Sequence, residues 1–207
     1  MGYQVAWAAV RDKPSAALLN QLDLQSIGTA QGDPWPDVRD YNGSIIGAAL
    51  TNGWYLLLAD SDDGWIERLT SGSLFPRISR NAEAVTCFFH EGIMASQATG
   101  WKNGRQLWFL SYDGSNGPGE YETWGQVPAE FAALREECER QQRQSPDSRV
   151  DYLFDAPVNL AEALVGLGRH ANQYLAELEH VSCEVLAEKP RRAFWARLLR
   201  RSGLISP

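Results

Sequence analysis

The stretch IIGAALTNGWYLLL, residues 45–58, holds two apolar runs separated by the pair Asn52-Gly53. Asn and Gly tolerate the positive φ angles of a two-residue turn, so this stretch predicts two antiparallel strands joined by a tight hairpin. The same arrangement recurs at residues 98–110, where Asn103-Gly104 separates two further runs. Two hairpins of this kind predict an antiparallel or mixed sheet.

The residues on either side of the first hairpin extend this sheet. Apolar runs and helical spacing predict, in order, a strand at 3–10, a helix at 14–22, the two hairpin strands, a helix at 64–70 and a strand at 84–90. This order of elements is that of a ferredoxin-like split unit. Helical spacing turns Trp65, Ile66 and Leu69 inward, and three further strands extend the sheet to about residue 125.

The chain becomes helical in character after residue 126. A helix is predicted at 129–142, a short strand at 150–154, a long helical region from Pro157 and a last helix from Pro190.

We therefore expect an α+β fold with an antiparallel or mixed sheet, helices mainly on one face and a helical C-terminal third. Residues 1–126 would form a sheet-rich α+β domain with a ferredoxin-like start. Residues 127–207 would form a mainly helical region packed on it, either as a second domain or as part of the first.

The charge of the chain is unevenly distributed. The 207 residues carry a formal net charge of −7, yet residues 189–201 hold six basic residues and no acidic one, which leaves −13 on the rest of the chain. An acidic body disfavours general nucleic-acid binding and favours basic partners. The basic tail has two interpretations: it docks on the acidic body, or it binds nucleic acid or an anionic membrane.

Cysteine usage and hydropathy indicate the compartment. Cys87, Cys138 and Cys183 are far apart and odd in number, so neither a disulfide framework nor a zinc site is predicted. No run approaches the roughly 18 consecutive apolar residues of a membrane span. The N-terminal apolar run is too short for a signal peptide. We therefore expect a cytoplasmic protein.

No motif in the chain identifies a reaction. His90-Glu91 lacks the second histidine of a zinc motif, because Met94 stands where that histidine would be. The acidic run 60–64 does not match the ligand spacing of a calcium loop. The glycine-rich run 114–119 is not followed by the lysine of a phosphate loop. We therefore predict no metal, no cofactor and no catalytic residue.

An alternative hypothesis is an enzyme whose site is assembled from residues distant in sequence. Its first candidates are His90, Glu91 and Cys87. On a regular strand, Cys87 and His90 point to opposite faces, which weakens this hypothesis.

The leading hypothesis is a non-enzymatic protein that binds another macromolecule. Tryptophans anchor protein interfaces, and acidic surfaces attract basic partners. The predicted partner-binding residues are aromatic or acidic: Trp35, Asp60, Asp62, Asp63, Trp65, Glu120 and Glu122. The predicted partner is a protein, with a basic toxin as the specific case. A third hypothesis is a regulatory protein whose basic tail, residues 189–201, binds nucleic acid or a membrane.

Several segments of this chain are similar to segments of other bacterial proteins. Gly53-Trp54-Tyr55-Leu56, residues 101–105 and residues 150–157 resemble the corresponding segments of a recurring group of bacterial proteins of unassigned function, over residues 1 to about 170. This resemblance implies no catalytic residues. The small, acidic α+β form is also similar in type to the immunity proteins of bacterial toxin systems, which implies neutralisation of a toxin by direct binding.

Overall fold

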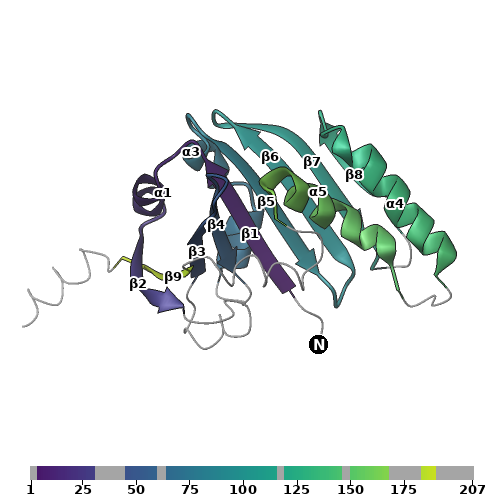
Figure 1. Cartoon of the computed structure of the whole chain (residues 1–207), viewed down its shortest axis with the longest axis horizontal. Helices are drawn as coiled ribbons and strands as arrows, with labels where there is room; N and C mark the ends of the chain where they lie inside the picture. Colours follow the sequence, from purple (N-terminus) through teal and green to yellow (C-terminus); the bar gives the residue numbers. More distant parts are fainter. Residues whose placement is uncertain are drawn as a thin grey trace, which may run out of the picture.

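The computed structural model describes residues 4–30, 45–59, 64–115, 119–145, 150–167 and 183–189. Their strands form one nine-stranded sheet in the order β2-β9-β3-β4-β1-β5-β6-β7-β8 (Figure 1). Every neighbouring pair is antiparallel. The strands are β1 (Gln4–Arg11), β2 (Leu24–Ala30), β3 (Ile45–Ala49), β4 (Tyr55–Ala59), β5 (Glu83–His90), β6 (Ala95–Lys102), β7 (Arg105–Asp113), β8 (Tyr121–Gly125) and β9 (Cys183–Glu188).

Helices cover both faces of this sheet. They are α1 (Ser15–Gln21), α2 (Trp65–Thr70), α3 (Phe75–Ile78), α4 (Glu130–Gln144) and α5 (Asp155–Val165), together with the 3₁₀ turn η2 (Tyr152–Phe154). Residues of α4 and α5 pack in one hydrophobic cluster, on what we term the first face. Residues of α1, α2 and α3 pack in another cluster, on the second face.

The central strand β1 shows why both faces need a cover. Its residues 5–10 are almost completely buried. Val5, Trp7 and Ala9 join the first-face cluster, and the residues between them join the second-face cluster. Because side chains alternate along a strand, an unbroken apolar run such as this one has to be covered on both sides.

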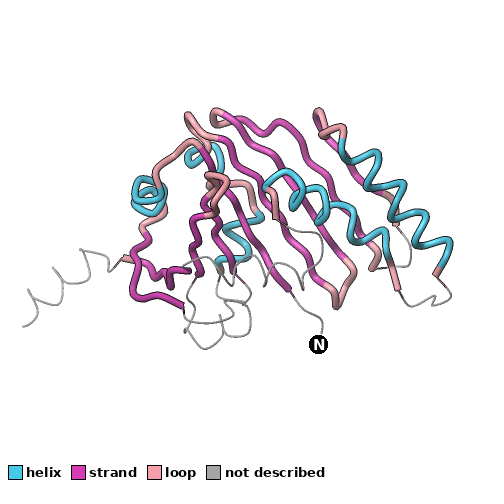
Figure 2. The backbone as a smooth tube through the Cα atoms, viewed as in Figure 1, coloured by secondary structure: helices cyan, strands magenta, loops and turns pink. Residues whose placement is uncertain are grey.

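The expected fold class is therefore wrong in two respects. Helices do not lie mainly on one face, and the C-terminal third is not simply helical. The last described helix ends at Val165, and β9 returns to the sheet between β2 and β3. Figure 2 shows how strands dominate the described chain. Residues 168–182 and the helix expected from Pro190 lie outside the described residues.

The strand expected at 150–154 is also wrong, since the chain forms the turn η2 there. The Asp151 side chain accepts a hydrogen bond from the Leu153 amide and starts this turn. A side chain that captures a nearby backbone amide competes with strand pairing.

Both predicted hairpins are confirmed, but only the second has the expected two-residue turn. In the first, the Leu50 amide donates to the Trp54 carbonyl, so residues 51–53 form the loop, with positive φ at Gly53 and not at Asn52. Asn52-Gly53 lies between β3 and β4, and Asn103-Gly104 lies between β6 and β7. The φ angles of Asn103 and Gly104 are 52° and 78°, as a primed two-residue turn requires. The expected helix at 64–70 and the expected strand at 84–90 are present as α2 and β5. In contrast, β2 interrupts the expected series of elements between α1 and β3.

The two faces are not covered to the same extent. The first-face cluster reaches Trp108, Leu110 and Tyr112 on β7, and Tyr121 on β8 packs against it. The second-face cluster reaches β6 at Trp101, and among the described residues it includes none from β7 or β8. Among the described residues, the second-face helices therefore reach only the start of β7, through α3, and none of them covers β8.

Candidate functional site

The open part of the second face carries an exposed tryptophan. Side chains alternate along β8, so Tyr121 points to the first face while Glu122 and Trp124 point to the second. Trp124 is 57% exposed, which is unusual for the largest apolar side chain. In the register of the sheet, Trp124 lies opposite Phe109, and Glu122 lies opposite Ser111.

We term the side chains gathered here the β7–β8 patch. It consists of Phe109, Ser111, Asp113, Glu120, Glu122 and Trp124. Because β8 is the last strand of the sheet, the patch lies at an edge that a partner can approach from the side as well as from above.

First-face contacts of Tyr121 hold β8 in place, in addition to its pairing with β7. The Tyr121 ring lies 5.4 Å from the Tyr112 ring and 5.3 Å from the Phe131 ring, measured between centroids. Its hydroxyl donates a hydrogen bond of 2.8 Å to the carbonyl of Leu153. Burial raises the pKa of Tyr121 above its usual range, so the phenol stays protonated. These contacts anchor β8 without help from Trp124.

The carboxylates of the patch are not neutralised by neighbouring cations. Within the described ranges, Asp113, Glu120 and Glu122 form no ion pair. The amide and hydroxyl of Ser115 hold the pKa of Asp113 below its usual value, which keeps that group ionised. The patch therefore joins an apolar indole to several exposed negative charges.

The helix α4 differs in part. Two of its four glutamates are paired: Arg135 Nε lies 2.7 Å from Glu139 Oε1, and Arg140 Nη2 lies 2.5 Å from Glu137 Oε1. Ion pairs of this kind along one helix are typical of a solvated surface. We therefore place the candidate binding surface on β7 and β8 and not on α4.

The structure brings together only part of the predicted site. Glu120 and Glu122 are exposed on the β7–β8 patch. The prediction that Trp65 contacts a partner is wrong, because its side chain is only 3% exposed. It is buried because it lies on the inward side of α2, and the Arg68 guanidinium lies 3.7 Å from its ring centroid.

The other predicted contacts, Trp35, Asp60, Asp62 and Asp63, lie outside the described residues, as does the basic tail beyond Lys189. Sequence reasoning missed Trp124. The available signal was its two-residue spacing from Glu122 on a predicted strand, which places both side chains on one face.

The candidate residues of the enzyme hypothesis do not converge. Cys87 is buried in the first-face cluster, whereas His90 is partly exposed at the end of β5 on the second face. Burial raises the pKa of Cys87 well above its usual value, so the thiol stays protonated and is a poor nucleophile. Across the described residues, no three His, Cys, Asp or Glu side chains are placed to hold a metal ion.

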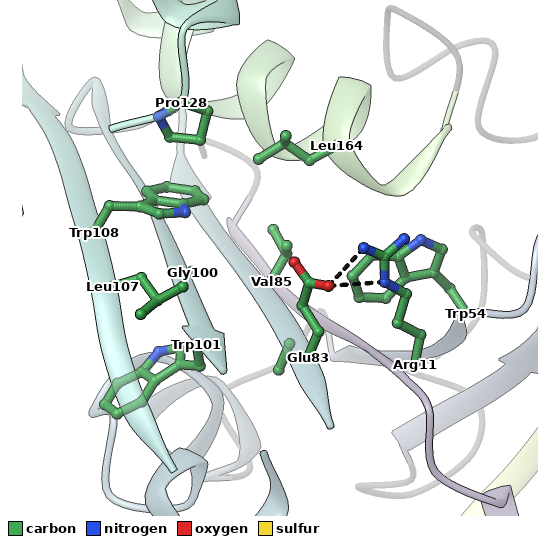
Figure 3. A pocket seen from close by; sticks show the side chains of 11 residues that line it. Arg11, Trp54, Glu83, Val85, Gly100, Trp101, Leu107, Trp108, Pro128 and Leu164 are labelled. Carbon is green, nitrogen blue, oxygen red and sulfur yellow. Dashed lines mark hydrogen bonds and ion pairs between the residues drawn. The ribbon is translucent and has the colours of Figure 1, made fainter. Parts of the chain in front are cut away.

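A small pocket lies at the opposite side of β7, on the first face (Figure 3). Gly100 faces Trp108 across the β6–β7 pair, and a Cβ atom at residue 100 would lie 2.0 Å from Trp108 Nε1. The missing side chain lets the indole lie flat across β6 and form a wall of the pocket. Pro128 and Leu164 form its roof, and Trp54 lies on the far side.

Comparison with protein-family models, with curated proteins and with solved structures finds no match to this chain. Within the described ranges, no helix has the length and apolar character needed to cross a membrane. The site therefore has to be interpreted from its own geometry.

Proposed function

We propose that this chain is a non-enzymatic protein that binds a basic partner protein through the β7–β8 patch. The single observation that carries the proposal is Trp124, which is 57% exposed on the same strand face as the unpaired carboxylate of Glu122, with Glu120 just before that strand. An exposed indole loses the stabilisation that burial supplies, and a partner that covers it restores this stabilisation in the complex.

Charge selects the class of partner. Carboxylates around an aromatic anchor attract lysine and arginine side chains and repel acidic surfaces. Long-range attraction to the acidic body also speeds the encounter with a basic protein. The overall charge of −7 has the same sign as the charge of the patch.

The specific form of the proposal is an immunity protein of the cytoplasm that neutralises a basic toxin by direct binding. Such a protein needs a rigid surface, an anchor residue and complementary charge, and it needs no chemistry of its own. The β7–β8 patch has these properties, since the nine-stranded sheet supports it from beneath.

The first test is site-specific photo-crosslinking in the native cell. A benzophenone amino acid replaces Glu122 in one variant and Glu136 in a control variant. Both positions are exposed, but Glu136 lies on the helix α4, away from the patch. We expect a covalent adduct with one basic protein from position 122 alone. No adduct from position 122, or the same adducts from both positions, would overturn the proposal.

The second test measures affinity for the protein that is captured. The double variant Glu120→Lys/Glu122→Lys should weaken binding at least about tenfold, because two attractive contacts become repulsive. The control Glu130→Lys/Glu136→Lys makes the same change in net charge on α4 and should have a much smaller effect. Equal losses in both variants would mean that only net charge matters and that the patch is not the interface.

A further inference from the structure

The pocket on the first face combines an apolar interior with a charged pair at its mouth. It has a volume of about 120 Å³, and its walls include the indoles of Trp54 and Trp108 and the side chains of Val85 and Leu164. Arg11, at the end of β1, and Glu83, at the start of β5, lie together at its rim (Figure 3). The pocket is lined by the ends of several strands and is roofed by α5, so its shape is set by the rigid sheet.

The charged pair leaves one oxygen and one nitrogen without a partner among the described residues. Arg11 Nε and Nη2 both donate to one carboxylate oxygen, Glu83 Oε2, at 3.0 and 2.5 Å. The Lys102 ammonium lies 3.8 Å from the same oxygen. Glu83 Oε1 and Arg11 Nη1 form no hydrogen bond with any described residue. The second oxygen of Glu83 points away from Arg11, to the side of the pocket where Trp108 lies (Figure 3).

The Arg11 side chain is also held in position from behind. Its guanidinium carbon lies 4.7 Å from the centroid of the Trp54 ring, within the range of a cation–π contact. A guanidinium fixed on one side by an indole and on another by a carboxylate presents its remaining N–H groups in a defined direction. The rim therefore offers a fixed acceptor, Glu83 Oε1, on the side of the apolar space, next to a fixed guanidinium.

We propose that this pocket binds a free α-amino acid with a branched aliphatic side chain. The α-ammonium donates to Glu83 Oε1, the α-carboxylate accepts from the Arg11 guanidinium, and the side chain enters the space between Trp54, Trp108 and Leu164. A zwitterion satisfies both rim groups and adds no net charge to the pair.

The size of the pocket sets the class of side chain. An engineered cavity of about 150 Å³ accepts a benzene ring. A pocket of about 120 Å³ is therefore suited to an isobutyl or sec-butyl group and is too small for an indole. Leucine and isoleucine meet this limit, and tryptophan does not.

The proposal goes beyond the function assigned to the β7–β8 patch and does not depend on it. Glu83 and Arg11 open on the first face, while Trp124 lies on the second face. Failure of either proposal leaves the other unaffected.

The test is calorimetric titration of the full chain with L-leucine and with two analogues that each lack one head group. 3-Methylbutylamine lacks the carboxylate, and 4-methylpentanoate lacks the ammonium. We expect L-leucine to bind, and each analogue to bind at least about tenfold more weakly, because each leaves a charged rim group without its partner. L-Tryptophan should not bind. No heat of binding with L-leucine or L-isoleucine, or equal affinity for leucine and both analogues, would overturn the proposal.

Two variants assign any binding to this pocket. Glu83→Gln keeps the shape of the side chain and removes its charge, so the affinity for L-leucine should fall at least about tenfold. The control Arg105→Gln changes an exposed charge on β7 that does not line the pocket, and the affinity should stay the same. Unchanged affinity in Glu83→Gln would contradict the assignment, and thermal unfolding of both variants verifies that each is folded.

Discussion

The two faces of β8 differ in what they contribute to the molecule. On the first face, Tyr121 packs against Tyr112 and Phe131 and donates a hydrogen bond to Leu153. On the second face, three residues further along the same strand, Trp124 is more than half exposed. One aromatic side chain holds the strand in the fold, and the other is left at the surface.

In the function that we propose, this difference separates stability from binding within five residues. An indole at the surface adds little to the free energy of unfolding, since burying a large apolar side chain is worth about 1.5–3 kcal/mol and Trp124 obtains only part of that gain. Contiguous exposed apolar groups beside polar ones mark interaction sites. The comparison thus predicts that first-face substitutions unfold the protein and that second-face substitutions act on its partner.

The largest effect is expected from removal of the first-face anchor. Tyr121→Ala should lower the free energy of unfolding by about 2–3 kcal/mol, because it deletes a half-buried ring and a hydrogen bond. Trp124→Ala should lower it by less than about 1 kcal/mol. Urea unfolding of both variants measures the difference. Equal losses would show that the two faces do not divide their roles as we describe.

The next effect concerns the hydrogen bond from the Tyr112 hydroxyl to Asp151 Oδ2, which is 2.6 Å long. The same hydroxyl accepts a hydrogen bond from the Gly119 amide, so it ties the turn η2 and the start of β8 to β7. Tyr112→Phe should cost about 1.5–2 kcal/mol at neutral pH, because the bond is made to a charged group. Glu122→Gln, on the opposite face, serves as the matched control and should have no measurable effect.

The pH dependence of this variant has a defined sign. Burial, and then the hydrogen bond to Asp151, raise the pKa of Tyr112 from 10.0 to about 12. The folded state therefore holds the phenol proton more tightly than the unfolded state does. The stabilisation is fully present below pH 10 and is lost as the pH rises from about 10 to about 12. The stability difference between wild type and Tyr112→Phe should therefore shrink over this range, and a constant difference would contradict the assigned cause.

The smallest effect on stability is expected from the charges of the patch. Glu120→Lys/Glu122→Lys should change the free energy of unfolding by no more than about 0.5 kcal/mol, because both carboxylates are exposed and form no ion pair with described residues. A chemical unfolding curve measures this change. A loss above about 1 kcal/mol would indicate that these residues support the fold and are not reserved for binding.

Local chemistry accounts for what the sequence could predict. The turn at Asn103-Gly104 depends on two residues with positive φ, and the loop at residues 51–53 depends on one, Gly53. The strands beside these turns follow from the same local signals. The helix α2 follows from the spacing of its buried residues, which also explains why Trp65 faces the core. Such features need no knowledge of the rest of the chain.

Long-range pairing accounts for most of the errors. The strand β9 pairs with β2 and β3, which are more than 130 residues earlier in the chain, and its short apolar run also fits helical spacing. Helices on both faces could not be foreseen either, because the apolar run of β1 does not say which helix covers which side. The candidate surface was anticipated only in part: Glu122 was predicted from charge, but the exposure of Trp124 depends on where the second-face cluster ends.

The most direct test of the account is the affinity of Trp124→Ala for the partner captured by crosslinking, measured by calorimetry beside the wild-type chain. The account predicts that binding weakens at least about tenfold while the far-ultraviolet circular dichroism and the unfolding midpoint stay close to those of the wild type. Unchanged affinity in this folded variant would contradict the claim that the β7–β8 patch is a binding surface.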